Sequence, residues 1–494
     1  MTADHPSDAD DIQGLVWSGY ASLTEASFLL LRIVDPPKAR NWLRRAPVTT
    51  VAHLTQHQAK ALQIAVSAAG LRKLDVSDTI MAGFSPEFLA GMTGDESRSR
   101  RLGDIGPNAP ANWLWGGHGE PDLVLLLYAA EGQLAAWQNE LTIDFSCCGL
   151  ELIHALGTSN MGGKEPFGFT DGVSQPKIDW QNTRTPGTSA DLDYGNLITT
   201  GEFLLGYRNE YALYTERPLL PAREASELPE AEDQPGLRDL GRNGTYLVFR
   251  ELHQDVLTFW QFMARRAGDN HAQELAEAFV GRRRSGEPMV STTSQPIRGV
   301  GPQRQDIAEN QFTFDHDTEG LQCPFGAHIR RANPRTGDLP GGKTGPIQKL
   351  IRTLALGKQN LGSDLIASSR FHRILRRGRE FGHWIDPDTA MQPGTPDPQS
   401  GLHFICLNAN ISRQFEFIQN AWLASAKFDG LSGESDPLTG NREIFPPGFS
   451  TDGFSQPQPS GVTERIDGLP RFVTVWGGGY FFLPGLRALR FLAG

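Results

Sequence analysis

Cysteine is scarce in this sequence. The 494 residues contain four cysteines, of which Cys147 and Cys148 are adjacent and Cys323 and Cys406 stand alone. So few cysteines in so long a chain do not make a disulfide framework, and their spacing does not match a zinc site. Buried, reduced thiols are therefore expected, in a chain long enough to form one large core or two ordinary ones.

The sequence also lacks long apolar runs and an excess of basic charge. Its longest apolar runs, such as residues 28–31 and 123–128, are far shorter than the ~20 residues that a membrane span needs. The acidic N-terminal stretch shows no secretory signal pattern. With 57 acidic and 46 basic residues the formal net charge is −11, which argues against a nucleic-acid partner. We therefore expect a soluble, cytoplasmic protein with neither nucleic acid nor membrane among its partners.

Short apolar runs alternate with helical patterns in the first part of the chain. Residues 28–33 predict a buried strand, and Asp35-Pro-Pro then opens a helix with prolines in its first turn. Residues 122–129 predict another strand, which leads into a helix with Leu134, Trp137 and Leu141 on one face. This order is typical of an α+β unit.

The same pattern returns in the second part of the chain. Strands are predicted at residues 244–249 and 402–407, each followed by an amphipathic helix, and two closing strands at 472–476 and 480–483 flank three glycines. Two α+β units are the economical interpretation, divided into residues 1–195 and 196–494. Long Gly/Pro/Asp-rich loops are expected at residues 334–346, 386–400 and 432–460.

One segment places an aspartate between two glycines. In the run from Lys164 to Pro176, Gly168 and Gly172 let the backbone pass close to a flat or bulky group while Asp171 is held in a fixed pose. On this segment alone, an Asx-turn at the end of a strand is the commoner explanation.

Two further segments combine histidine or arginine with glycine. His328 lies in Cys323-Pro-Phe-Gly-Ala-His-Ile-Arg-Arg-Ala-Asn-Pro-Arg335, and Arg376 lies in Ile374-Leu-Arg-Arg-Gly378. A lone histidine is more often structural than a ligand, but the arginines around this one would suit the acidic groups of a cofactor. The Arg376 segment carries little specificity by itself.

Together the three segments resemble the fingerprint of the dye-decolourising peroxidase family, in the family's order and over nearly the whole chain. The sequence is similar to the larger bacterial and fungal-like branch. The resemblance implies two ferredoxin-like units of the dimeric α/β-barrel type, with haem b bound in the second unit. It also implies reduction of hydrogen peroxide through an oxyferryl intermediate and oxidation of phenolic or dye-like donors.

The resemblance also implies roles for individual residues. His328 would bind the haem iron, Asp171 would move the protons of the peroxide, and Arg376 would stabilise the charge that develops. Further haem contacts are expected from the following residues: Arg330, Arg335, Gly172, Val173, Leu402, Phe404 and Asn410. The acceptor for the second ring nitrogen of His328 would be Asn410 or Glu416, although Asn410 serves equally well as a helix cap.

The route of electrons from bulky donors departs from the family pattern. Many relatives carry a tyrosine where this chain has Phe381, which cannot form a tyrosyl radical. Trp384 could substitute, although a buried structural tryptophan is the commoner explanation.

Two other functions compete with a peroxidase. A haem-binding or iron-releasing protein with incidental peroxidase activity would need neither Asp171 nor Arg376. A hydrolase that pairs Asp171 with His328 lacks the expected nucleophile or metal motif. As a peroxidase, the protein is expected to be a monomer or homodimer.

Overall fold

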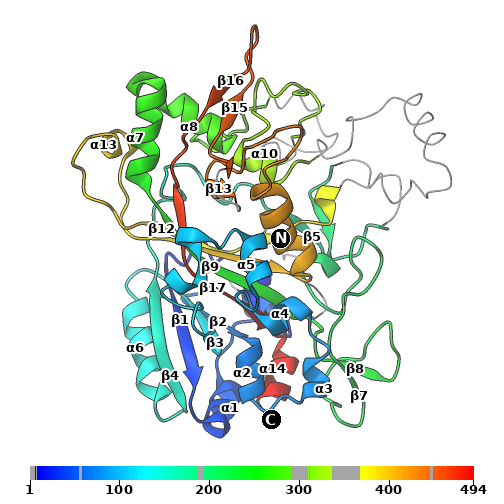
Figure 1. Ribbon diagram of the computed structural model, residues 1–494. Coiled ribbons are helices and arrows are strands. Elements are labelled where there is room, and N and C mark those ends of the chain that lie inside the picture. Colours follow the sequence, from blue (N-terminus) through cyan, green and yellow to red (C-terminus); the bar gives the residue numbers. More distant parts are fainter. Residues whose placement is uncertain are drawn as a thin grey trace, which may run out of the picture.

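The computed structural model describes residues 6, 8–54, 58–186, 194–290, 310, 312–335, 368–444 and 449–494 (Figure 1). Most of the expected loop at 334–346 lies outside these residues. In the described part of the chain, no helix has the length and apolar character needed to cross a membrane.

The first unit has the strand and helix order of a ferredoxin-like fold. Its elements are β1 (Glu25–Ile33), α1 (Pro36–Arg45), β2 (Lys60–Val66), β3 (Leu123–Ala129), α6 (Leu134–Phe145) and β4 (Leu150–Gly157). The strands are antiparallel in the order β2-β3-β1-β4. α1 begins directly after Asp35 with its two prolines, as predicted, and the Asp35 carboxylate caps it by accepting from the Lys38 N–H at 3.3 Å. Every residue of β3 is buried, which explains its continuous apolar run.

The second unit repeats this order. Its elements are β9 (Thr245–Gln254), α7 (Val256–Ala267), β10 (Leu375–Arg376), β11 (Arg379–Phe381), β12 (Gly401–Asn408), the turns η9 (Ser412–Glu416) and η10 (Ile418–Leu423), and β17 (Val473–Leu483). The strand order is β10-β12-β9-β17, and β11 also pairs with β12. Where a helix was expected near residues 415–423, the chain is wound as two π-helical turns.

The two units share one antiparallel sheet, because β17 pairs with β2 at Phe482 and Val66. The two largest apolar clusters of buried residues are built on this sheet and include residues from both units. The expected α+β class with two ferredoxin-like units is therefore confirmed. The predicted division at residue 195 lies between β4 and β9 and stays a prediction.

A single strand replaces the two closing strands that the sequence predicted. β17 runs through the three glycines, and its register with β9 shifts between Val475 and Gly477, as a β-bulge does. A Cβ on Gly477 would lie 2.4 Å from the indole nitrogen of Trp115, so only glycine fits there. Three glycines in a strand indicate a bulge or a sharp turn. The structure has the bulge, and it does not interrupt the strand.

The remaining elements connect or cover the two units. The helices are α2 (Ala68–Lys73), α3 (Asp78–Met81), α4 (Pro86–Ala90), α5 (Glu96–Leu102), α8 (Ala272–Val280), α10 (His328–Ala332), α13 (Pro387–Ala390) and α14 (Leu486–Leu492). The short strands are β5 (Lys177–Asp179), β6 (Leu197–Thr199), β7 (Leu219–Pro221), β8 (Leu237–Asp239), β13 (Glu443–Ile444), β14 (Phe449–Ser450), β15 (Phe454–Gln456) and β16 (Glu464–Ile466). In Figure 1 α7, α8 and α10 lie above β12, at the end of the molecule opposite α1 and α14.

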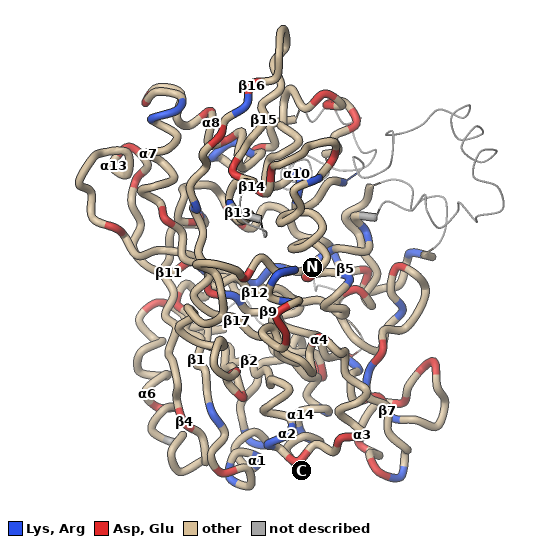
Figure 2. Tube along the Cα trace, in the orientation of Figure 1, with Lys and Arg blue, Asp and Glu red and all other residues tan. Residues whose placement is uncertain are grey.

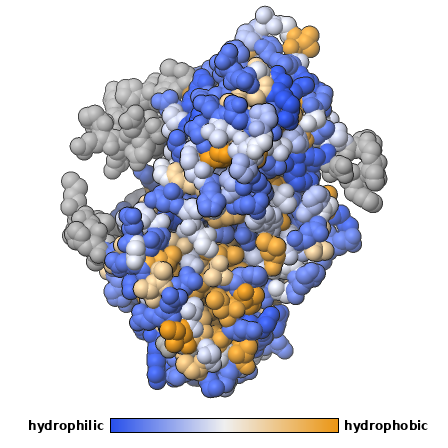
Figure 3. Space-filling model, turned by 90° about the vertical axis from the view of Figure 1, so that its left-hand side faces the viewer, coloured by the Kyte–Doolittle hydropathy of each residue, from blue (hydrophilic) through white to orange (hydrophobic). Residues whose placement is uncertain are grey.

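Charge and hydropathy are distributed unevenly over the molecule. Figure 2 shows acidic and basic residues interspersed along the chain, with basic segments in the middle near β12 and β5. Figure 3 shows apolar residues gathered in the lower half of the face that carries α6 and β4, and Ile143 and Leu152 are exposed in these two elements. The mixture of signs along the described chain agrees with the composition of 57 acidic and 46 basic residues.

Candidate active site

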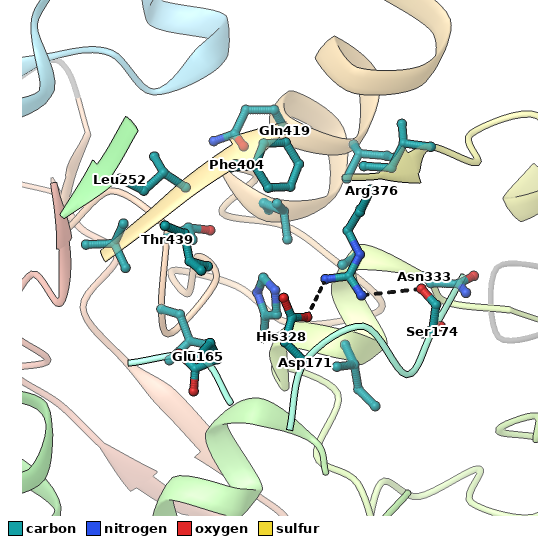
Figure 4. A pocket seen from close by; sticks show the side chains of 18 of the residues that line it. Glu165, Asp171, Ser174, Leu252, His328, Asn333, Arg376, Phe404, Gln419 and Thr439 are labelled. Atoms are coloured by element: carbon teal, nitrogen blue, oxygen red, sulfur yellow. Dashed lines mark hydrogen bonds and ion pairs between the residues drawn. The ribbon is translucent and has the colours of Figure 1, made fainter. Parts of the chain in front are cut away.

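A cavity of about 320 Å³ lies between the strands of the second unit and α10, and residues from the segments 102–108 and 165–176 also line it. Leu252 of β9, Leu402 and Phe404 of β12, and Val473 of β17 line it from the sheet. Asp171, His328 and Arg376 all line the same cavity, although they come from three separate parts of the chain (Figure 4). The fold therefore brings together the three residues that the sequence singled out.

His328 is the first residue of α10, and one of its ring nitrogens is already engaged. Its Nδ1 donates to Oδ2 of Asp436 at 2.9 Å. This contact fixes the orientation of the ring and leaves Nε2 as the nitrogen that can bind a metal. Burial opposes protonation of His328, but the Asp436 carboxylate outweighs it and raises the pKa of His328 above its ordinary value.

Asp436 is fully buried and held by its own loop. Its Oδ1 accepts from the backbone N–H groups of Leu438 at 3.0 Å and Thr439 at 2.8 Å, and from the Thr439 hydroxyl at 3.0 Å. Burial alone would raise the pKa of Asp436, but His328 and the Thr439 N–H lower it to about 2. Sequence reasoning missed this residue, and its only signal was the long Asp-rich loop at 432–460.

The two residues expected to accept the His328 proton lie elsewhere, so that prediction was wrong. Asn410 Oδ1 accepts from the Arg413 N–H at 2.9 Å and the Ser412 hydroxyl at 3.2 Å, which makes Asn410 the cap of the following helical turns. Glu416 accepts from the Tyr480 hydroxyl at 3.0 Å and pairs with Arg98 at 3.3 Å. Neither residue lines the cavity.

Asp171 and Arg376 form an ion pair at the cavity. Arg376 Nη1 lies 3.1 Å from Asp171 Oδ1, and Nη2 donates to the Ser174 carbonyl at 3.3 Å (Figure 4). Both side chains remain about one-third exposed, at 37% for Asp171 and 34% for Arg376. The pair therefore combines a proton acceptor and a cation in a place that small molecules can reach.

The turn before Asp171 is held by a buried carboxylate. Glu165 accepts from the N–H groups of Phe167 at 3.0 Å and Phe169 at 2.9 Å, and from the Gln254 side chain at 2.7 Å. Gly168 has a φ of 98°, a conformation that favours glycine. Burial raises the pKa of Glu165 to about 7 despite these hydrogen bonds, and the charge of Asp171 adds to the rise.

Of the other residues predicted to contact haem, five line the cavity: Gly172, Val173, Arg335, Leu402 and Phe404. Arg330 does not line it, so its predicted role was wrong. Its guanidinium pairs with Asp317 at 3.0 Å and donates to the Cys323 carbonyl at 2.7 Å. Positions two apart on a helix point in nearly opposite directions, so Arg330 leaves α10 away from His328.

Arg335 and Arg373 concentrate positive charge on one side of the cavity. Within the described residues their hydrogen bonds go to neutral acceptors: Arg335 donates to the carbonyls of Asn310 and Phe312, both at 2.8 Å, and Arg373 donates to the Tyr194 hydroxyl at 2.9 Å. Burial lowers the pKa of Arg335 to about 10, and the nearby Arg373 adds to this. For Tyr194, burial raises the pKa, but the two arginines lower it to about 8. An anionic ligand would relieve this crowding of positive charge.

The two aromatic residues considered for electron transfer differ in exposure. Phe381 is buried and stacks on His403 at 4.6 Å. Trp384 is 40% exposed, which rules out the buried structural role considered for it. A Cβ added to Gly168, in the turn that precedes Asp171, would lie 3.4 Å from the Trp384 ring, and the Lys164 ammonium lies 5.6 Å from the centre of that ring.

Known proteins with a similar sequence are peroxidases. Dye-decolorizing peroxidase msp1 of Mycetinis scorodonius is 29% identical over 458 residues, which cover 87% of this chain and 76% of that protein. Multifunctional dye peroxidase DyP2 of an Amycolatopsis species is 28% identical over 449 residues, covering 87% and 82%. No family model matches the chain.

Solved structures agree with the fold. The crystal structure of a fungal DyP-type peroxidase from Auricularia auricula-judae has a TM-score of 0.71 and 24% identity, with all of both chains covered. A dye-decolorizing peroxidase whose heme pocket was engineered for asymmetric sulfoxidation has the same TM-score and identity, with 98% of this chain and 99% of that one covered.

Proposed function

The chain belongs to the dye-decolourising peroxidase family, and we propose that the cavity between α10 and β12 is where it uses hydrogen peroxide to oxidise phenolic and dye-like donors. We propose that it is a haem peroxidase, since its relatives are named dye-decolorizing peroxidases and the description of one similar structure names a heme pocket. The observation that carries the assignment of the site is that the His328–Asp436 pair and the Asp171–Arg376 pair line one cavity.

The residues of the cavity fit haem b. His328 has one ring nitrogen engaged and the other available to iron. Arg335 and Arg373 are buried cations, and their hydrogen bonds to the part of the chain that the structure describes go to neutral groups, so they suit the two carboxylates of haem. Leu402 and Phe404 supply the apolar wall that a porphyrin face requires, and 320 Å³ is within the ~300–1,000 Å³ of small-molecule sites.

Haem would supply the redox chemistry, and the chain would supply the ligand, the proton transfer and the electric field. Asp436 would hold the proton on Nδ1 of His328, which raises the basicity of Nε2, the nitrogen that would bind the iron. Asp171 would take a proton from one oxygen of the peroxide on its carboxylate and return it to the departing oxygen. Arg376, 3.1 Å from that carboxylate, would stabilise the negative charge that develops between these two steps.

We propose Trp384 as the surface position at which bulky donors deliver electrons. It is 40% exposed and lies against the turn that carries Asp171, whereas Phe381 is buried and not oxidised at comparable potentials. Small phenols would reach the cavity itself and bypass this route.

The alternative, a haem carrier with incidental activity, would not need a carboxylate paired with an arginine inside its pocket. The experiment that separates the two functions is the absorption spectrum of haem-loaded protein before and after one equivalent of peroxide. A peroxidase gives a rapid spectral change that a phenolic donor reverses. A carrier gives slow bleaching with no turnover. A cytoplasmic location and a monomeric or homodimeric state remain predictions.

A further inference from the structure

Gln175 holds the backbone of Arg376 with both ends of its side-chain amide. The Arg376 N–H donates to Gln175 Oε1 at 3.1 Å, and Gln175 Nε2 donates to the Arg376 carbonyl at 3.2 Å. Arg376 lies on the two-residue strand β10, whose other edge pairs with β12 opposite Cys406. The glutamine side chain therefore takes the place of a missing neighbouring strand.

The backbone of Gln175 is itself fixed from two directions. Its carbonyl accepts from the side-chain amides of Asn196 at 2.7 Å and Asn310 at 2.9 Å. Asn310 also accepts from the Ser174 hydroxyl at 2.9 Å. The backbone carbonyl of Asn310 in turn accepts from Arg335 at 2.8 Å. These bonds therefore connect the Asp171 loop to the arginines of the cavity.

We infer that Gln175 is a positioning residue. By holding the backbone of Arg376, it keeps the Arg376 guanidinium within hydrogen-bond distance of the Asp171 carboxylate. This inference rests on the proposed function, because the position of Arg376 matters only if it acts on bound peroxide. Glutamine suits the task because its amide offers one donor and one acceptor, which match one backbone carbonyl and one N–H. Without them the backbone of Arg376 keeps, among the described residues, its pairing with β12 and one bond at its carbonyl from Arg377 Nη1 at 3.2 Å. With fewer bonds to its backbone, Arg376 can move relative to Asp171.

The chain contains a matched control for this arrangement. Gln13 makes the same two-sided contact with Ile64, accepting from its N–H at 2.9 Å and donating to its carbonyl at 2.8 Å. Gln13 is buried in the first unit and does not line the cavity. Gln13→Leu therefore removes the same pair of hydrogen bonds, together with a third bond from Nε2 to the Pro484 carbonyl at 2.9 Å, and leaves the contacts of Arg376 in place.

The test compares haem-loaded wild type, Gln175→Leu, Gln175→Glu and Gln13→Leu. We expect Gln175→Leu to slow the reaction with peroxide about 10²-fold, the cost of displacing a catalytic group by about 1 Å. The affinity of the ferric protein for fluoride, an anion that Arg376 would bind, should fall about tenfold. Gln13→Leu should lower the midpoint of unfolding at least as much as Gln175→Leu does. It should nevertheless keep the rate of the peroxide reaction and the fluoride affinity within twofold of wild type.

Gln175→Glu keeps the acceptor but loses the donor, so it should show a partial loss in both measurements. If Gln175→Leu does not fold, Gln175→Glu replaces it in the test, and a loss of both peroxide rate and fluoride affinity relative to Gln13→Leu is again the expected result. Wild-type values in both Gln175 variants, or equal losses in Gln13→Leu, would overturn the inference. A wild-type protein that does not react with peroxide would instead overturn the proposed function.

Discussion

Replacing Asp436 by asparagine should change the protonation of His328 rather than merely weaken a contact. Oδ1 of Asp436 accepts from two backbone N–H groups and the Thr439 hydroxyl, while Oδ2 accepts from His328 Nδ1. Asparagine has one side-chain oxygen, and the three donors at the Oδ1 position hold it there. The amide nitrogen then faces His328, so Nδ1 must accept and the ring proton moves to Nε2, the nitrogen that iron needs.

The opposite orientation of the asparagine is also unfavourable. It would leave the buried N–H groups of Leu438 and Thr439 facing an amide nitrogen, and each unsatisfied group costs about 1–3 kcal/mol. Either orientation weakens binding of haem through His328. We expect the haem affinity of Asp436→Asn to fall ~10–100-fold, the usual effect of losing a partner of a metal-binding histidine. That range corresponds to about 1.4–2.8 kcal/mol.

The assay is an absorbance titration of the haem-free protein with haemin at pH 7. Asp317→Asn is a matched control, because Asp317 is also buried and accepts from the backbone N–H groups of Gln322 at 3.0 Å and Cys323 at 2.9 Å. Its partner is Arg330 rather than His328, so this variant should lose stability but keep wild-type haem affinity. Wild-type affinity in Asp436→Asn would refute the reasoning.

Two further predictions concern Trp384 and Glu165. Trp384→Phe should lower turnover of a large anthraquinone dye several-fold more than turnover of a small phenol, and equal losses in steady-state assays would remove Trp384 from the electron route. Glu165 has its pKa raised by burial from 4.5 to about 7, so the folded state holds its proton more tightly than the unfolded state. Its ionisation therefore destabilises the fold increasingly as pH rises from about 4.5 to 7, by at most about 3 kcal/mol. Glu165→Gln should accordingly gain free energy of unfolding relative to wild type between pH 5 and pH 8, and a difference that is constant with pH in urea unfolding would contradict the assignment.

The strands and helices of both units follow from local patterns in the sequence. The apolar run of β3 and the prolines at the start of α1 determine local structure regardless of what packs on them. The continuity of β17 could not be predicted, because it depends on Trp115 filling the space beside Gly477. Glycines signal a bulge or an end, and only the neighbouring chain decides between them.

The residues of the site also fall into those that local sequence patterns indicate and those that depend on distant parts of the chain. Asp171, His328 and Arg376 lie in segments with recognisable composition, and the fold brings all three to one cavity. Asp436 contacts His328 across 108 residues of sequence, from a loop with no helical or strand periodicity, so no local pattern indicates the pair. Asn410 was assigned to His328 from the family resemblance, but it precedes a helical segment, and a residue in that position uses its side chain to cap the helix.

The reaction of haem-loaded protein with peroxide, followed by stopped-flow absorbance in wild type and Asp171→Asn, tests the central claim most directly. We predict a haem spectrum in both proteins, a fast change with peroxide in the wild type, and a reaction slowed at least about 10²-fold in the variant, which cannot accept the proton. A protein that stays colourless with haemin, or an Asp171→Asn variant that reacts as fast as the wild type, would contradict the account.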